Sequence, residues 1–435
     1  MSRPRAISGY PEFLPAGYAI EQKVLDALRQ VFELHGFAGI ETRAVEPLEV
    51  LLRKGEIDKE VFTVRRIHAE ADAADEMALH FDLTVPFARY VLENAGHLTF
   101  PFRRYQMQKV WRGERPQEGR YREFRQADID IVGDGLLAPH HDTEIALVAV
   151  EGFERLHTDV GTPPVRLHVN NRKLAQGFYE GLGIENTAGV LQRVDKYDKI
   201  GPEKVAELLT TELGLSDAVA RQCIALADIQ TTDASFVDQV RALGVSSELL
   251  ETGLEELVSL VETAGTATPD RIVADLKIAR GLDYYTGTVY ETELVGFEHI
   301  GSVGSGGRYD SLASDGKRTY PGVGFSFGVS RLLVPLITKG ELQASRPVPT
   351  CVLVAVDSED TRAEATAIAQ QLRSRGIPCE VAPKADKFGK QIRYADRRQI
   401  PYVWFGTDQV KDIRTGEQVQ ADAASWMPAA QDLVR

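Results

Sequence analysis

Apolar residues recur every three to four positions in several long stretches of the chain, which is the spacing of a helix with one buried face. The first stretch, residues 18–36, predicts a helix that Gly36 ends. A second amphipathic helix is predicted over residues 141–157. Between about 186 and 264, apolar residues recur at helical spacing with short polar breaks, so we expect a helical insertion within a larger domain.

The end of the chain has a different pattern, in which strand-like runs alternate with helical ones. The runs are CVLVAV, IPCEVA and IPYVWFG. Such alternation with short connections is typical of a mainly parallel sheet with right-handed crossovers. The segment RPVPT at 346–350 reads as a linker, so we predict two domains, residues 1–345 and residues 346–435.

Residues 103–133 contain two strand-like arms on either side of a charged loop, the pattern of an antiparallel hairpin with a long tip. Alternate side chains of a strand share a face, so Ala127, Ile129 and Ile131 are expected in the core. The opposite face carries an aromatic ring, an amide and two carboxylates: Phe124, Gln126, Asp128 and Asp130. This face suits the floor of a polar cleft, although a solvated sheet face has the same alternation.

Several arginines surround the loop of this hairpin, namely Arg112, Arg115, Arg120 and Arg122. The planar guanidinium group suits phosphate, and several of them around one turn suit a polyphosphate. A solvated charged loop would explain them as well, and in isolation it is the better explanation.

Two glycine-rich segments lie further along. Residues 300–312, IGSVGSGGRYDSL, match neither a Walker loop nor GxGxxG, so the glycines indicate either a closely bound ligand or only a tight turn. Residues 321–333 run from a strand into a helix that carries Arg331 in its first turns. Helix N–H groups and a guanidinium would attract an anion there, and tight packing of small residues is the alternative.

Two shorter segments complete the candidates. Asp82 and Thr84 precede an apolar helix, where they could bind a ligand or only cap the helix. Residues 280–291, RGLDYYTGTVYE, crowd an arginine, an aspartate and two tyrosines together, which an ordinary buried strand would not do. We expect this segment to bind a small polar ligand.

Composition limits the partners and the compartment. The net charge of −14 argues against a nucleic-acid partner, although residues 102–125 and 384–398 are locally basic. Three cysteines without CxxC or His/Cys spacing predict a reducing compartment and no zinc site. No apolar run approaches the ~20 residues of a membrane helix and no signal-peptide pattern is present, so we expect a cytoplasmic protein without membrane contact.

These segments, in this order, resemble the three motifs of class II aminoacyl-tRNA synthetases, and the resemblance to the histidyl-tRNA synthetases covers nearly the whole chain. RGLDYYTGTVYE and GSGGRYD resemble their two histidine-binding motifs, VWRGERPQEGRYREFRQADIDIVG the second class motif, and GVGFSFGVSRL the third. GIETRAVEP, which ends at Pro47, is a weaker match to the first motif, which forms the dimer. The resemblance implies an α+β catalytic domain built on an antiparallel sheet, a C-terminal anticodon-binding α/β domain and a homodimer.

The resemblance also implies a role for each candidate around ATP. Arg112 and Arg331 match the arginines that hold the α- and γ-phosphates, and Arg120 lies near the triphosphate. Phe124 matches the ring that stacks on adenine. ATP is expected with Mg²⁺ and without an organic prosthetic group or a metal held by side-chain motifs.

Around L-histidine, the resemblance places Asp82, Thr84 and Gln126 near the α-amino and carboxylate groups. Asp130 and Tyr285 match the pair that contacts the imidazole. Arg280 matches the catalytic arginine, which contacts both the carboxylate and the α-phosphate. Tyr284 is a further histidine-binding candidate, for which a structural role in the turn is as good an explanation.

For tRNA(His), the resemblance places Arg115 and Gln117 near the acceptor end. Cations of the tail would contact the anticodon arm, although a solvated helix face explains them nearly as well: Lys384, Lys387, Lys390, Arg393, Arg397 and Arg398. Two positions depart from the family pattern, because Asp130 replaces a common glutamate and His80 a usual arginine.

Two other functions remain open from the sequence. One is a synthetase-like subunit that senses histidine and regulates a biosynthetic enzyme, and the other is an RNA-binding module without catalysis. The presence of Arg112, Arg280, Tyr285 and Arg331 together with the tail favours an enzyme.

Overall fold

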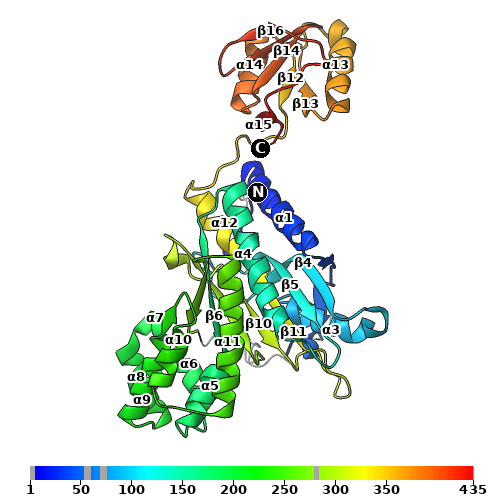
Figure 1. The fold of residues 1–435 in the computed structure, drawn as a ribbon. Coiled ribbons are helices and arrows are strands. Elements are labelled where there is room, and N and C mark those ends of the chain that lie inside the picture. Colours follow the sequence, from blue (N-terminus) through cyan, green and yellow to red (C-terminus); the bar gives the residue numbers. More distant parts are fainter. Residues whose placement is uncertain (1–4, 53–59, 69–75, 279–283, 435) are drawn as a thin grey trace. The chain divides into compact units, whose positions relative to one another are not determined.

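The computed structural model describes residues 5–52, 60–68, 76–278 and 284–434 (Figure 1). The chain divides into two compact units, which we call unit 1 (residues 1–11 and 24–338) and unit 2 (residues 12–23 and 339–435). The division falls within α1 (Pro15–Leu34), the helix expected over residues 18–36. Gly36 follows this helix with a φ of 76°, a left-handed conformation that favours glycine.

Unit 1 is built on a nine-stranded sheet. In spatial order its strands are β1 (Ala38–Gly39), β4 (Phe102–Trp111), β5 (Glu123–Val132), β11 (Gly322–Phe327), β10 (Gly304–Tyr309), β9 (Thr288–Leu294), β6 (Val165–Asn171), β8 (Ile272–Asp275) and β7 (Gln230–Thr231). The strands from β4 through to β6 pair antiparallel, whereas β1 with β4 and β6 with β8 pair parallel. The large sheet is therefore mixed, because a long helical crossover brings the chain from β6 back to the same end of the sheet before β8.

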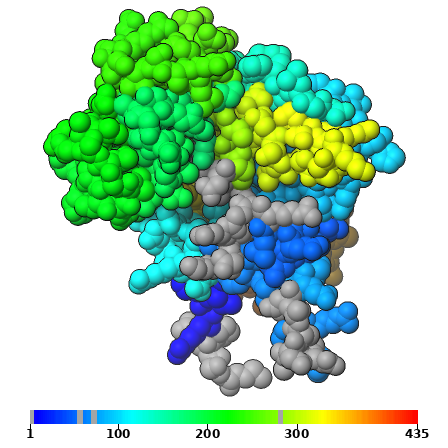
Figure 2. All heavy atoms as spheres, turned by 90° about the horizontal axis from the view of Figure 1, so that it is seen from below, coloured from blue at the N-terminus to red at the C-terminus, as the bar shows by residue number. Residues whose placement is uncertain are grey.

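The helical crossover lies between residues 187 and 267. Its helices are α6 (Thr187–Val194), α7 (Tyr197–Ile200), α8 (Pro202–Leu213), α9 (Asp217–Ala227), α10 (Phe236–Ala242) and α11 (Glu248–Ala267). Figure 2 shows these helices, in green, gathered as a lobe on one side of the face seen there. The longest of them, α11, packs against α4 and α5 and thereby joins the lobe to the sheet.

The other helices of unit 1 are α2 (Leu48–Leu52), α3 (Thr84–Asn94), α4 (His140–Val160), α5 (Arg172–Gly181) and α12 (Val329–Thr338), and a separate two-stranded ladder joins β2 (Val45–Pro47) to β3 (Met77–Leu79). Helix α4 covers one face of the large sheet. Its Phe153 ring lies 6.1 Å from the Phe325 ring and 4.7 Å from the Phe327 ring. Gly152 permits this approach, because a Cβ there would lie 2.8 Å from Phe327.

The β4–β5 hairpin has the two faces that its alternation predicted. Ala127, Ile129 and Ile131 are fully buried in the core. Asp128 and Asp130, on the opposite face, are each only 3% exposed. The alternative of a solvated sheet face is therefore wrong, and two carboxyl groups lie inside the protein.

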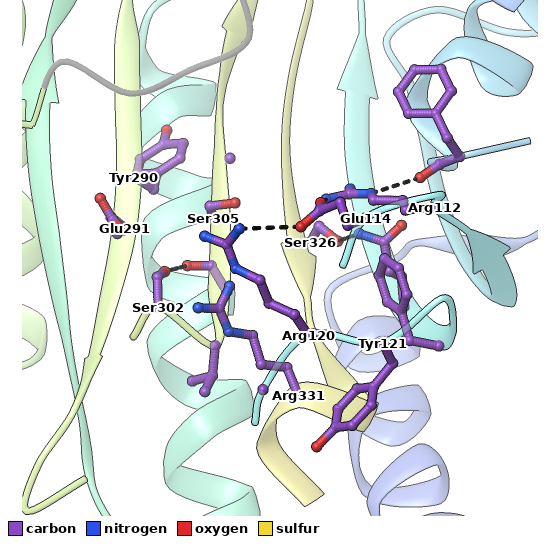
Figure 3. Close-up of a pocket in the computed structure, with 18 of the residues that line it drawn as sticks. Arg112, Glu114, Arg120, Tyr121, Tyr290, Glu291, Ser302, Ser305, Ser326 and Arg331 are labelled. Carbon is purple, nitrogen blue, oxygen red and sulfur yellow. Dashed lines mark hydrogen bonds and ion pairs between the residues drawn. The ribbon is translucent and has the colours of Figure 1, made fainter. Parts of the chain in front are cut away.

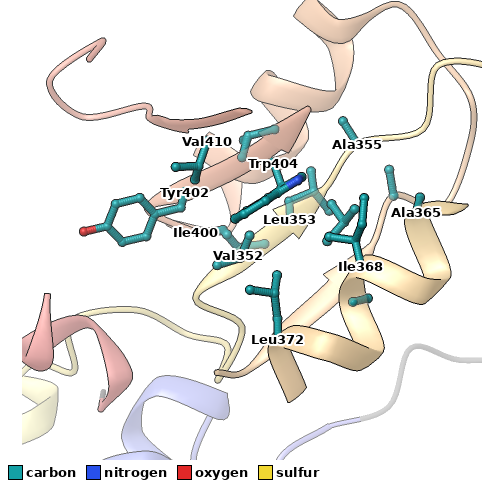
Figure 4. Packing of buried hydrophobic residues seen from close by; sticks show 14 of the residues in the cluster. Val352, Leu353, Ala355, Ala365, Ile368, Leu372, Ile400, Tyr402, Trp404 and Val410 are labelled. Carbon is teal, nitrogen blue, oxygen red and sulfur yellow. The ribbon is translucent and has the colours of Figure 1, made fainter. Parts of the chain in front are cut away.

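Unit 2 contains a five-stranded sheet whose core is shown in Figure 4. In spatial order its strands are β13 (Cys379–Val381), β12 (Val352–Val354), β14 (Tyr402–Phe405), β15 (Gln409–Asp412) and β16 (Gln418–Gln420), and its helices are α13 (Arg362–Ser374), α14 (Phe388–Arg397) and α15 (Ala430–Leu433). The first three strands pair parallel as expected. The last two pair antiparallel, so parallel pairing does not dominate this sheet. The polar, exposed residues of β16 gave no strand signal.

Within the described residues, no helix is long and apolar enough to cross a lipid bilayer.

Candidate active site

A cavity of about 410 Å³ opens over the polar face of the large sheet (Figure 3). Strands β5, β10 and β11 contribute Gln126, Ser305 and Ser326 to its wall. It brings together six of the predicted site residues: Arg112, Arg120, Phe124, Gln126, Tyr285 and Arg331. The cavity therefore combines cations, an aromatic ring and neutral hydrogen-bonding groups.

Two of the three arginines are fixed by backbone carbonyl groups. Arg112 donates from Nε to the carbonyl oxygen of Phe81 over 3.1 Å, and its guanidinium carbon lies 5.1 Å from the centre of the Phe124 ring. Arg331, in the first turn of α12, donates from Nε and Nη2 to the carbonyl oxygen of Ile300 over 3.3 and 2.9 Å. These backbone contacts hold both guanidinium groups at the cavity, where their planar donors suit an anion.

The third arginine is balanced by an acid. Arg120 donates from Nη1 to Glu114 Oε2 over 3.2 Å, and Arg112 lies 3.8 Å from the other oxygen of the same carboxylate. Arg120 and Arg331 run in the same direction across the cavity in Figure 3. Glu114 thus contacts the guanidinium groups of both Arg112 and Arg120 and holds them at the cavity.

Beneath this cavity lies a polar floor that is closed to solvent. Arg104 Nη2 lies 2.6 Å from Asp130 Oδ2, and the Tyr309 hydroxyl donates to Asp130 Oδ1 over 2.7 Å. Arg104 is fully buried and its guanidinium carbon lies 4.3 Å from the centre of the Phe87 ring. Neither Arg104 nor Tyr309 was among the predicted site residues. Arg104 lies directly opposite Asp130 in the β4–β5 register, and the alternation of faces along β4 puts it on the polar face with Asp130.

The two carboxyl groups of the floor have raised pKa values. Burial raises the pKa of Asp130 to about 6, although the Arg104 guanidinium and the Tyr309 hydroxyl act in the opposite direction. Burial raises the pKa of Asp128 to about 7, against the influence of Arg104 and of Ser326, which donates to Asp128 Oδ1 over 2.5 Å. Asp130 is therefore mainly ionised at neutral pH, and Asp128 titrates near it.

The glycine-rich segments make room for these side chains. A Cβ on Gly324 would lie 2.1 Å from Asp130 Oδ1, and one on Gly307 would lie 2.9 Å from the Tyr285 ring. The segment GSGGRYD forms strand β10 and not a tight turn, and its glycines lie against side chains of the floor. The close approach of a ligand to these glycines stays a prediction.

A small cavity of about 20 Å³ lies within the floor, lined by Thr84, Asp130 and Tyr285 among others. The Tyr284 hydroxyl is hydrogen-bonded to Thr84 and Tyr285, and burial raises the pKa of both tyrosines. The Tyr284 ring contacts the Tyr285 ring edge-on with 4.7 Å between centres. Thr84, Asp130, Tyr284 and Tyr285 are thus brought together, as predicted for a histidine site.

Other predicted residues lie elsewhere or have simpler roles. Asp82 is buried and accepts the backbone N–H of Val85 over 3.2 Å, which stabilises the first turn of α3, although the N-cap position itself is Leu83 and not Asp82 or Thr84. His80 is buried, which lowers its pKa, and its Nε2 lies 2.8 Å from the carbonyl oxygen of Lys109. The imidazole of His80 is therefore a neutral donor to the hairpin backbone. Arg280 lies outside the described residues.

The loop residues Arg115 and Gln117 are exposed and do not line the 410 Å³ cavity. Gln117 exchanges two backbone hydrogen bonds with Arg120, of 3.1 and 2.9 Å, which shape the tip of the loop. Gln117 also lines a neighbouring cavity of about 620 Å³ beside α7 and β9.

Two of the predicted cations in and around α14 of unit 2 have acidic partners. Lys390 lies 3.1 Å from Asp386, and Arg398 lies 2.7 Å from Glu380. The remaining predicted cations, Lys384, Lys387, Arg393 and Arg397, are exposed and form no ion pair with another described residue. They are the groups that α14 and the turn before it offer to a polyanion.

Within the described part of the chain, no three His, Cys, Asp or Glu side chains converge as a metal site would require. The cysteines are separate, with Cys223 and Cys351 buried and Cys379 half-buried.

Comparison with known proteins finds one family model that matches most of unit 1 and another that matches most of unit 2. A family model described as histidyl-tRNA synthetase matches residues 9–332, and one described as an anticodon binding domain matches residues 350–425. Relatives from Cutibacterium acnes and Micrococcus luteus, both named histidine–tRNA ligase, are 64% and 59% identical to the chain. Each alignment covers 100% of this chain and 98% of the relative.

A solved structure shows the same fold. The crystal structure of histidyl-tRNA synthetase from Nostoc sp. PCC 7120 matches with a TM-score of 0.86 at 34% identity, covering 97% of this chain and 98% of that one. The arginine-lined cavity and its polar floor lie within the part of the chain that these relatives match. The chain therefore belongs to the histidyl-tRNA synthetase family.

Proposed function

We propose that the chain is a histidine–tRNA ligase, which activates L-histidine with ATP to histidyl-adenylate and pyrophosphate and then transfers histidine to the 3′ end of tRNA(His). The observation that carries this proposal is a cavity with three arginines and an aromatic ring directly above a buried floor of carboxyl and phenol groups. Polyphosphate and imidazole are the ligand groups that these two parts suit.

ATP would occupy the upper part. Adenine would stack on Phe124, whose face Arg112 already contacts, and Arg112, Arg120 and Arg331 would hold the phosphates. One or two carboxylates together with nucleotide phosphates are the usual environment of Mg²⁺. Glu114 and Glu291 line the cavity and would hold the ion there, where it would neutralise phosphate charge.

The imidazole of histidine would occupy the floor. A neutral imidazole has one donor and one acceptor nitrogen, which the Asp130 carboxylate and the Tyr285 hydroxyl would bind respectively. Both oxygens of Asp130 already have a partner, so Arg104 and Tyr309 would orient the carboxylate for a further bond. The 20 Å³ cavity has room for about one water molecule. An imidazole therefore enters only when floor side chains such as Tyr285 move apart.

Activation needs no general base in this arrangement. The histidine carboxylate is ionised at neutral pH and attacks the α-phosphorus in line, expelling pyrophosphate. Catalysis would come from positioning and from positive charge beside the phosphoryl oxygens. Arg112 would supply that charge, and the resemblance alone assigns a similar contact to Arg280.

We further propose that the chain acts as a homodimer on tRNA(His). The first motif supports the dimer by resemblance alone. The exposed Arg115 and Gln117 would approach the acceptor end, and residues 346–435 would bind the anticodon arm through the exposed cations of α14. Single-stranded anticodon bases can be splayed and stacked by a protein, which double-stranded RNA does not permit.

Pyrophosphate exchange with each of the twenty amino acids tests the activation step. We expect exchange confined to histidine. Exchange with none of them would contradict the proposal and favour the histidine-sensing regulatory subunit. Light scattering of the purified chain tests the dimer separately.

A further inference from the structure

A relay of hydrogen bonds across two strands holds the side chain of Gln126. Gln126 Nε2 donates to Ser326 Oγ over 2.9 Å, and Ser326 Oγ donates to Asp128 Oδ1 over 2.5 Å. Ser326 lies directly opposite Asp128 in the β5–β11 register, so all three side chains are on the polar face of the sheet. The relay is built entirely on regular strands.

The proton inventory of these groups fixes the direction of the relay. An ionised carboxylate only accepts, a hydroxyl carries one proton, and an amide nitrogen only donates. Ser326 uses its proton on Asp128, so it can only accept from Gln126. The amide nitrogen of Gln126 therefore points to Ser326, and its carbonyl oxygen points away from the relay.

This carbonyl oxygen is the end that a ligand can use. Gln126 lines the 410 Å³ cavity but is only 8% exposed. Its Oε1 is buried and accepts no hydrogen bond from any residue within the described ranges. A buried acceptor is unfavourable without a donor, and a bound ligand that carries an N–H group would supply one.

We propose that Asp128 and Ser326 are positioning residues that fix Gln126 with its carbonyl oxygen towards the α-ammonium group of the bound amino acid. This inference rests on the proposed function, since it takes histidine as the ligand. The resemblance places Gln126 near both the α-amino and the carboxylate groups. The relay selects the ammonium, because the substrate carboxylate has only acceptors and would face another acceptor.

The relay runs in this direction while Asp128 is ionised. Burial raises the pKa of Asp128 to about 7, Arg104 on β4 and Ser326 on β11 act to lower it, and Asp130 on β5 and Asp82 before α3 act to raise it. The Tyr285 hydroxyl also faces this group and is itself neutral, because burial raises its pKa. Experiments at pH 8 therefore examine the ionised relay.

The test compares histidine with 3-(imidazol-4-yl)propionate, which has the same ring and carboxylate but no α-ammonium group. Asp128→Asn permits the reversed relay, in which the introduced amide donates to the Ser326 hydroxyl and Gln126 turns its NH₂ towards the ligand. We expect this variant to raise the KM for histidine in pyrophosphate exchange about tenfold or more, and to change the inhibition constant of the propionate less than about twofold.

Ser326→Ala releases Gln126 without reversing it. We therefore expect a smaller rise in the KM for histidine, of about threefold, again with little change for the propionate. A role in packing alone would move both constants in parallel in both variants, and that outcome overturns the inference. An unchanged KM for histidine in both variants overturns it as well.

A matched control removes another hydroxyl that donates to a buried carboxylate of the same unit. Thr288 donates from Oγ1 to Asp142 Oδ2 over 2.6 Å, and Thr288 lines neither the 410 Å³ nor the 20 Å³ cavity. Thr288→Val is expected to leave both constants unchanged. Wild-type protein that shows no exchange with histidine contradicts the proposed function, whereas active wild type with unresponsive relay variants contradicts only the relay.

Discussion

The floor of the cavity in unit 1 and the centre of the sheet in unit 2 are both buried, but their chemistry is opposite. In unit 1, the floor of the cavity buries Arg104, Asp128 and Asp130, where Arg104 pairs with Asp130 and Asp128 accepts a hydrogen bond from Ser326. In unit 2, strands β12 and β14 bury Leu353 and Val403 among other apolar side chains. Buried polar groups depend on each partner being present, whereas buried hydrocarbon depends on filled volume. The same change in side-chain size should therefore have different consequences in the two units.

The largest effect is expected where a charge loses its partner in the floor. Arg104→Met leaves the buried Asp130 carboxylate without its ion pair, and we expect the free energy of unfolding of unit 1 to fall by about 4 kcal/mol. Urea unfolding measures the loss, and hydrogen exchange of the β4–β5 amides localises it.

The neighbouring residue on the opposite face of β4 provides the control. Arg103 pairs with Glu144, and both side chains are partly exposed. Arg103→Met should cost no more than about 1 kcal/mol. Equal losses of unfolding free energy in the two variants would show that burial of the ion pair does not determine the cost of removing its arginine.

A somewhat smaller loss is expected in the apolar sheet. Leu353 is fully buried, so Leu353→Ala should destabilise unit 2 by about 3 kcal/mol through lost contacts and a cavity. Histidine-dependent pyrophosphate exchange should be retained, because the residue lies in the core of the other unit. The partly exposed Val419 of β16 is the control, and Val419→Ala should be nearly neutral. Loss of exchange in the Leu353 variant would contradict the separation of the two units.

Removal of one hydroxyl should affect activity in the floor and not in unit 2. Tyr285→Phe removes the proposed donor to the imidazole, and we expect kcat/KM for histidine to fall about 30-fold, equivalent to about 2 kcal/mol. In unit 2, the Tyr402 hydroxyl donates to Asp432 Oδ2 over 2.8 Å. Tyr402→Phe should leave the exchange kinetics unchanged. A similar kcat/KM for the wild type, Tyr285→Phe and Tyr402→Phe would exclude Tyr285 from imidazole recognition.

The sequence was most informative where alternation had one physical explanation. The period of two in residues 123–132 correctly assigned the core face and the polar face of β5. Such alternation depends on neighbours within one strand, which a sequence displays directly. The pattern alone favoured a solvated loop for the arginines, and only the resemblance placed Arg112, Arg120 and Arg331 around one ligand; the structure brings these three to one cavity.

Features that depend on the register between strands could not be obtained in the same way. Arg104 and Ser326 become partners of the floor carboxyl groups only because β4 and β11 flank β5 in one particular register. The glycines of β10 and β11 likewise have a reason only once Tyr285 and Asp130 lie against them. A hairpin with a long tip leaves several registers open, so the sequence suggested the cleft without the network beneath it.

The two units should respond to pH with opposite signs. Burial raises the pKa of Asp128 to about 7, so the folded state binds more protons than the unfolded state between about pH 4 and 7. Stability of unit 1 from this group falls as the pH rises through that window, by at most about 1.4 kcal/mol per pH unit, and is constant above it. Asp128→Asn should flatten this slope in urea unfolding at pH 5.5, 6.5 and 7.5.

In unit 2, Arg414 holds the pKa of Asp432 below its ordinary value. Stability from this pair is present above the unfolded pKa of about 4 and is lost as the pH falls through the lower folded value. Unit 2 should therefore be destabilised by acid in the range where the floor of unit 1 is not. Parallel pH profiles for the two units would contradict the opposite environments of their carboxyl groups.

The smallest effect is expected on the exposed surface of unit 2. Lys387, just before α14, is exposed and has no acidic partner among the described residues, whereas Lys390 in the first turn of that helix lies 3.1 Å from Asp386. Lys387→Ala should raise the KM for tRNA about threefold and lower the salt dependence of binding by about one counterion. Lys390→Ala should have less effect, because its charge is already partly compensated. Pyrophosphate exchange should stay unchanged in both, since it requires no tRNA. Equal responses of the two lysines would indicate that net charge, and not the free cations around α14, attracts the tRNA.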